Sequence, residues 1–176
     1  MSELKITTKN NSPNEQIIYR NLYSLLDRYN VSKWLFTDQV VIDEMVEIPH
    51  SHPTLTINTK YLKNDHLLLT TFIHEQLHWY AVLNFTQIKA VINELKTFYK
   101  HVPVGYPKGA KDEFSTYLHL VINFLEVKAL HELLEKEEAE AVIAFLMGDH
   151  YTWIYETVSK NNNFIHTLLI KHKIYL

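Results

Sequence analysis

His74, Glu75 and His78 are the residues of this sequence whose types and spacing could carry out chemistry. The two histidines stand four residues apart in His74-Glu75-Gln76-Leu77-His78. Residues four apart lie on one face of a helix, so both imidazoles could bind one metal ion. Glu75 lies one residue further round the helix, too far to share the position of the metal ligands. Its carboxylate could still take a proton from a water bound to the ion. The spacing H-E-x-x-H therefore indicates a zinc site with a neighbouring base.

The residues around this motif favour a buried helix. The run 71–80 carries no charge other than that of Glu75. A helix on the surface would show charged side chains on its outer face. Two buried imidazoles need polar partners, and one metal ion would serve both. The alternative is a pair of surface histidines beside an exposed glutamate, which arises by chance on many helices.

A second polar group lies in the apolar helix that we expect over 113–134. His119, Asn123 and Glu126 follow one another at helical spacing and would form one narrow stripe on that helix. Such a stripe calls for a partner helix of complementary chemistry, and the helix that carries the motif offers one. Asn123 could equally be an ordinary core residue with its hydrogen bonds satisfied.

The motif and its flanks resemble the longer signature of the zincin metallopeptidases. Thr71 stands three residues before the first histidine and Tyr80 two residues after the second. Ala81 and Asn84 occupy the places where the metzincin branch has its glycine and third histidine. The resemblance is therefore to the gluzincins, in particular to the small minimal ones, and it spans roughly 33–130.

This resemblance implies a catalytic Zn²⁺ held by the two motif histidines and by a glutamate from a later helix, with Glu75 as the base. Glu126 is our first choice for that third ligand, and His119 is the rival, which we otherwise expect to orient a metal ligand or to contact substrate. The gluzincin pattern has Asn before the ligand and Asp four residues after it, whereas this chain has Leu125 and Leu130. A carboxylate that orients a ligand histidine must then come from elsewhere. Candidates are Asp112, Glu113 and Asp149.

The resemblance also implies a substrate cleft. In zincins the strand before the motif helix forms the rim of the cleft and pairs with extended substrate, and 54–59 has that place here. We expect Thr56 and Asn58 to bind substrate, although an ordinary edge strand is the alternative. A donor for the oxyanion is expected from the C-terminal part, with Tyr155 and His150 as candidates. A packed aromatic helix face is the alternative for Tyr155.

The order of the elements predicts one α+β domain over 1–176. It is expected to be zincin-like, with a small N-terminal β-sheet, the active-site helix and a mainly helical C-terminal half. A capping box at Ser12 and Glu15 begins a helix that ends at Asn30. The segments 34–42 and 54–59 read as strands. The alternation of polar and apolar residues over 54–59 predicts a strand with one face on the core and one face open. Further helices are expected over about 66–84, 87–100, 113–134, 136–147, 151–160 and 163–172, with a loop over 101–110.

Composition narrows the classes of partner and compartment. The 176 residues include no cysteine, so imidazole and carboxylate must hold any metal, and the net charge of −3 disfavours nucleic acid. No stretch approaches the ~18 apolar residues of a membrane span. The residues 1–5 lack the pattern of a secretory signal, so a cytoplasmic location is expected.

We therefore predict a zinc-dependent peptidase that hydrolyses a peptide or protein substrate through a metal-activated water. A catalytically silent zincin-fold binding or regulatory protein is the alternative, since such a protein would keep the same motif. A helical interaction domain without metal is the third possibility.

Overall fold

Three short parallel strands form a sheet near the N-terminus in the computed structural model, which describes residues 4–176. Their order is β1 (Lys5–Thr8), β2 (Gln39–Ile42) and β3 (Leu55–Ile57). Parallel strands need a crossover connection, and α1 (Pro13–Arg28) lies in the one between β1 and β2. The α+β class with a small N-terminal sheet is confirmed, and a short 3₁₀ turn (Ser32–Trp34) precedes β2.

The strands differ from their predicted form in two ways. β1 was not predicted, and the segment 34–42 is extended strand only over its last four residues. The alternation at 54–59 predicted a strand with one open face, and this is wrong. Leu55, Thr56 and Ile57 are all buried, so β3 has neighbours on both faces.

The start of α1 is the predicted capping box. The Ser12 side chain accepts a hydrogen bond from the Glu15 backbone N–H, and the Glu15 carboxylate accepts one from the Ser12 N–H. Glu15 is fully buried and also accepts from the backbone and side-chain amides of Asn10 and from the Glu44 N–H. One carboxylate thus joins the β1–α1 loop to the segment that follows β2.

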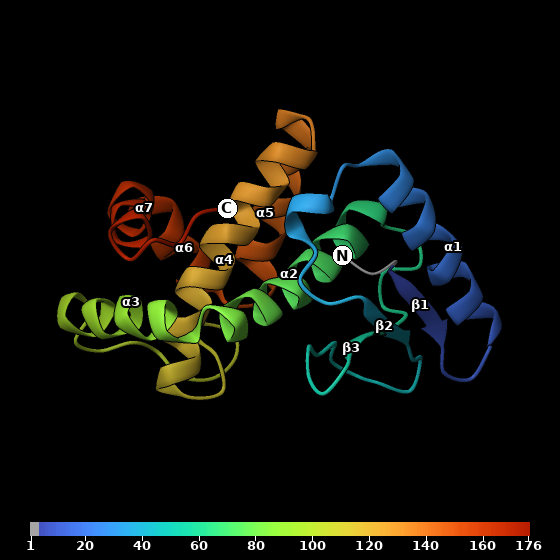
Figure 1. Cartoon of the computed structure of the whole chain (residues 1–176), viewed down its shortest axis with the longest axis horizontal. Coiled ribbons are helices and arrows are strands. Elements are labelled where there is room, and N and C mark those ends of the chain that lie inside the picture. Colours follow the sequence, from blue (N-terminus) through green and yellow to red (C-terminus); the bar gives the residue numbers. More distant parts are fainter. Residues whose placement is uncertain (1–3) are drawn as a thin grey trace. The chain divides into compact units, whose positions relative to one another are not determined.

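The remaining helices match the predicted ranges closely. They are α2 (Asp65–Leu83), α3 (Phe85–Phe98), α4 (Glu113–Leu133), α5 (Lys136–Asp149), α6 (Thr152–Lys160) and α7 (Asn162–Lys171). The chain divides into two compact units, Met1–Tyr80 and Ala81–Leu176, so α2 begins in the first unit and ends in the second. Within the second unit, α3, α5, α6 and α7 all contact α4, which is the central helix of that unit (Figure 1).

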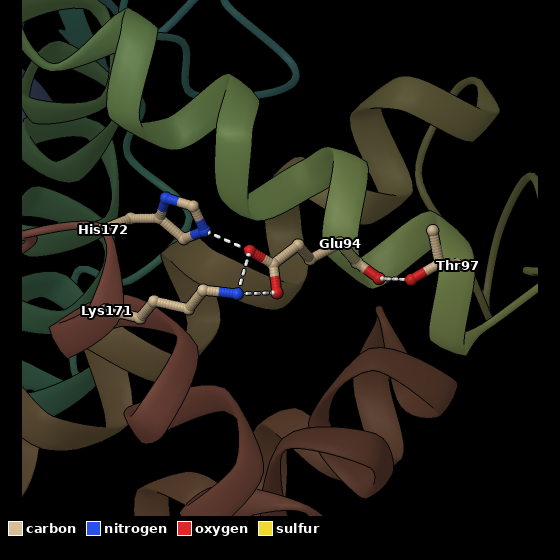
Figure 2. Close-up of polar contacts among 4 residues, drawn as sticks. All are labelled: Glu94, Thr97, Lys171 and His172. Carbon is tan, nitrogen blue, oxygen red and sulfur yellow. Dashed lines mark hydrogen bonds and ion pairs between the residues drawn. The ribbon is translucent and has the colours of Figure 1, made fainter.

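Figure 2 shows how α3 and α7 are joined inside the second unit. The Glu94 carboxylate accepts hydrogen bonds from Lys171 Nζ at 2.8 Å and from His172 Nε2 at 2.5 Å. The bond from Lys171, followed by that from His172, holds the pKa of the Glu94 carboxyl below its ordinary value. Lys171 is largely exposed, so this contact orients the C-terminal helix more than it stabilises the fold.

Two further expectations bear on the whole chain. Over residues 4–176, none of the helices combines the length and the apolar character that a membrane crossing requires. The single domain over 1–176 stays a prediction, and the reading of 1–5 falls partly outside the described residues.

The buried Glu15 carboxylate generates a test of stability. Burial raises the pKa of Glu15, but the hydrogen bonds from Glu44, Asn10 and Ser12 outweigh it, so the pKa lies below the ordinary 4.5. Glu15→Gln should lower the free energy of unfolding by about 1–3 kcal/mol, because an amide nitrogen cannot accept these bonds. A carboxyl group whose pKa is lowered by folding stabilises the protein at pH values above its pKa in the unfolded chain, and this stabilisation is lost as the pH falls. The loss of stability in Glu15→Gln should therefore become smaller below about pH 4.5.

Chemical denaturation of the two proteins between pH 3 and pH 7 would measure this difference. The exposed Asp27→Asn on the same helix is the matched control. Equal loss of stability in both variants, or a deficit independent of pH, would contradict the role of Glu15.

Candidate metal centre

His74 and His78 lie in α2, in the part of the helix that the sequence predicted to be buried. Phe72, Ile73 and Leu77 around them are inaccessible to solvent or nearly so, while the two histidines are half-buried. Their ring centroids lie 5.1 Å apart at an interplanar angle of 67°. The spacing of four residues has thus placed the two imidazoles side by side, as one face of a helix requires.

Gln76, between the two histidines, fastens this stretch of α2 to the chain before β2. Its Oε1 accepts hydrogen bonds from the backbone N–H groups of Phe36 (2.7 Å) and Thr37 (2.9 Å), and its Nε2 donates to the Thr37 carbonyl at 3.0 Å. Gln76 has no exposed surface. The motif treats this position as variable, so nothing in the spacing pointed to its role.

His119 lies in α4 and is buried. Its Nδ1 is 2.7 Å from the Ser115 carbonyl oxygen. A carbonyl can only accept, so Nδ1 must carry the proton and donate it. In a neutral imidazole the lone pair is then on Nε2, which is the form that binds a metal. The bond to Ser115 therefore fixes the tautomer and limits, without fully fixing, the orientation of the ring.

The structure brings these three histidines together. One ligand atom from each of His74, His78 and His119 lies within 4.8 Å of the other two. Imidazole nitrogen is a common ligand of zinc, at a distance of about 2.0–2.1 Å. Three imidazoles that leave one position open are the donor set of a catalytic rather than a structural zinc site. The chain thus has a three-histidine group that could hold a metal ion, whose identity the donors alone do not fix.

Glu126 was the first choice for the third ligand, and it is not a member of this group. It is buried in α4, where its Oε2 accepts a 2.7 Å hydrogen bond from the hydroxyl of the equally buried Tyr155 in α6. A ligand role for Glu126 stays a prediction, whereas its rival His119 is in the group. Tyr155 has a single hydroxyl proton, which it donates to Glu126, so an oxyanion could receive it only if this bond opened.

Glu75 and His150 complete the predicted catalytic residues. Glu75 follows His74 in α2 and is buried. His150 ends α5, with Nδ1 2.9 Å from Asp149 Oδ2, and both side chains are about one-third exposed (34% and 33%). Asp149 thus orients a histidine, but one outside the group of three. Asp112, another candidate for that task, accepts from the Ser115 N–H as the N-cap of α4.

The predicted substrate strand is covered by its own chain. Thr56 exchanges two backbone hydrogen bonds with His50, and the Asn58 side chain donates to the Glu47 carbonyl. Both Thr56 and Asn58 are buried. A substrate that paired at Thr56 would have to displace His50, so the expectation of an open edge is wrong there. Substrate binding by Thr56 and Asn58 stays a prediction.

Asn123 is the third member of the polar stripe on α4. It is completely buried, and neither its Oδ1 nor its Nδ2 has a hydrogen-bond partner among the described residues. The reading of Asn123 as a satisfied core residue is therefore wrong.

The three-histidine group predicts that the protein binds one equivalent of Zn²⁺. Loss of a residue that only contacts a metal ligand weakens metal binding about 10–100-fold. Replacing His74, His78 or His119 by alanine removes a ligand itself and should weaken binding by more than this. Competition with a chelating dye would measure the affinity, and bound zinc should raise the Tm of the wild type. The exposed His101→Ala is the matched control. Unchanged affinity in His119→Ala would remove this residue from the centre.

Comparisons with family models, with curated proteins and with solved structures find no match to this chain. The resemblance to zincins therefore depends on the motif and its flanks, and it stays a prediction.

Proposed function

We propose that this protein is a zinc-dependent peptidase whose metal ligands are His74, His78 and His119. The observation that carries the proposal is the group of three histidines that each have one ligand atom within 4.8 Å of the other two, with Glu75 next to the first of them in the sequence. Three neutral donors leave the ion with its full positive charge. An ion of that kind activates water more strongly than one neutralised by carboxylate ligands.

Zn²⁺ bound there would polarise a carbonyl oxygen and make a water molecule more acidic. The chain's own residues then have separate tasks. Glu75 takes the proton of the attacking water and returns it to the leaving amine, as a general base and then a general acid. Its burial strengthens these interactions, because bulk water screens them less. Ser115 keeps His119 in the tautomer that presents Nε2.

We choose the candidate donors for the oxyanion from the hydrogen-bonding capacity of their side chains. When both ring nitrogens of His150 carry protons, Nδ1 donates to Asp149 and Nε2 could donate to the oxyanion. Tyr155 is the second candidate, after release from Glu126. The peptide nature of the substrate and the cytoplasmic location depend on the resemblance and on sequence features, and both are part of the proposal.

A peptidase and a silent binding protein of the same fold differ in one property, which is turnover. Metal-loaded wild type should cleave members of a mixed peptide library, and a chelator should stop the cleavage. Full occupancy by zinc with no cleavage of any peptide would favour the binding protein and overturn the peptidase proposal.

Glu75→Gln provides the sharpest test of mechanism. It should bind Zn²⁺ as the wild type does, because Glu75 is not a ligand, and should lose about 10²–10⁴-fold in kcat, because an amide cannot accept the proton. The exposed Glu140→Gln on α5 is the matched control and should keep full activity. Cleavage of a fluorogenic peptide found in the library would measure all three proteins. Equal activity in Glu75→Gln and the wild type would exclude Glu75 as the base.

A further inference from the structure

Tyr151 has a backbone conformation that is unusual for a bulky residue. It lies between α5 and α6 with φ 53° and ψ 33°, in the left-handed region. Glycine, and to a lesser extent asparagine, adopt this region readily, whereas a tyrosine side chain is strained there. Such a residue persists only where its surroundings determine its conformation, and residues of this kind cluster at functional sites.

The backbone around Tyr151 is held on both sides. The next residue, Thr152, donates its N–H to the Pro107 carbonyl at 2.9 Å, and the Tyr151 carbonyl accepts from the Tyr155 N–H at 2.9 Å. The first bond comes from the loop 101–110, and the second belongs to the first turn of α6. Together these two hydrogen bonds hold the backbone of Tyr151 and so fix the direction in which its side chain leaves the backbone.

The loop that supplies Pro107 is itself built onto α4. The Thr116 hydroxyl donates to the Pro103 carbonyl at 3.0 Å and accepts from the Ala110 N–H at 3.0 Å. Gly109 approaches the same segment so closely that a Cβ there would lie 2.0 Å from the Pro103 carbonyl oxygen. The loop is therefore an ordered support between α4 and α6, and Thr116 lies one turn before His119.

The ring of Tyr151 packs against His119. Their ring centroids lie 4.4 Å apart with an interplanar angle of 43°. The Ser115 carbonyl holds one nitrogen of the imidazole, but a single hydrogen bond still lets the ring swing about its axis. An aromatic ring against one face limits that swing and so limits where Nε2 can point.

We propose that Tyr151 is a positioning residue for the metal ligand His119, and that its strained backbone is retained because it places the ring there. The inference rests on the proposed metal centre. It assigns to the loop 101–110 the task of holding Tyr151 through Thr152 and Pro107. On this proposal the loop 101–110 and the start of α6 take part in metal binding although neither supplies a ligand.

Titration with Co²⁺ alone tests this, because its visible absorption reports both affinity and ligand geometry. Tyr151→Phe should bind within about threefold of the wild type, since the ring remains. Tyr151→Ala and Tyr151→Gly should both bind about 10–100-fold more weakly, as expected for loss of an outer partner, with an altered cobalt spectrum.

Thermal stability of the metal-free proteins separates positioning from folding. Tyr151→Gly should melt about 2–4 °C above Tyr151→Ala, because glycine relieves the left-handed strain that alanine keeps. If Tyr151 only stabilised the fold, the more stable Tyr151→Gly would also bind metal more tightly than Tyr151→Ala. The inference requires equal loss of affinity in both variants despite their different stabilities.

Three results would overturn the inference. Wild-type affinity in Tyr151→Ala and Tyr151→Gly would remove Tyr151 from the metal centre while leaving the centre intact. A loss in Tyr151→Phe as large as in the other two would assign the effect to the hydroxyl. Absence of cobalt binding in the wild type itself would end the proposed function, and the inference with it.

Discussion

Three imidazole nitrogens within 4.8 Å of one another, on His74, His78 and His119, impose a strict electrostatic condition. Three positively charged rings at that separation would repel one another. In its neutral form each ring has one nitrogen with a lone pair, and the bond from His119 Nδ1 to the Ser115 carbonyl leaves that lone pair on Nε2. A divalent cation satisfies all three lone pairs at once. The roles that we propose for the residues supporting these histidines follow from this condition.

Each helix that contributes a histidine is supported by a residue that is not a ligand. Gln76 joins α2 to Phe36 and Thr37 in the first unit. Tyr151 packs against His119 in the second. Metal sites depend on such outer contacts, because a ligand that moves freely loses entropy when it binds. Its hydrogen bonds also explain why Gln76 can be buried at a position that the motif leaves open.

The sequence predicted the helices well because periodicity and capping are local. The box at Ser12 and Glu15 and the loop 101–110 were read correctly from neighbouring residues. β1 was missed since four residues carry little pattern. The burial of β3 depends on its pairing with β2 and on the bridge from Thr56 to His50, which the pattern of 54–59 alone does not show. His119 and Glu126 share one helix face, so spacing alone could not choose between them. The residues next to Tyr151 in the sequence do not predict its left-handed backbone conformation.

Anomalous diffraction at the zinc absorption edge, from crystals soaked in Zn²⁺, tests the three-histidine centre most directly. A single peak is expected about 2.0–2.1 Å from one nitrogen each of His74, His78 and His119. At His119 that nitrogen should be Nε2, with Nδ1 still bonded to Ser115. No peak at this position, or a peak bound by Glu126 with His119 outside its reach, would contradict it.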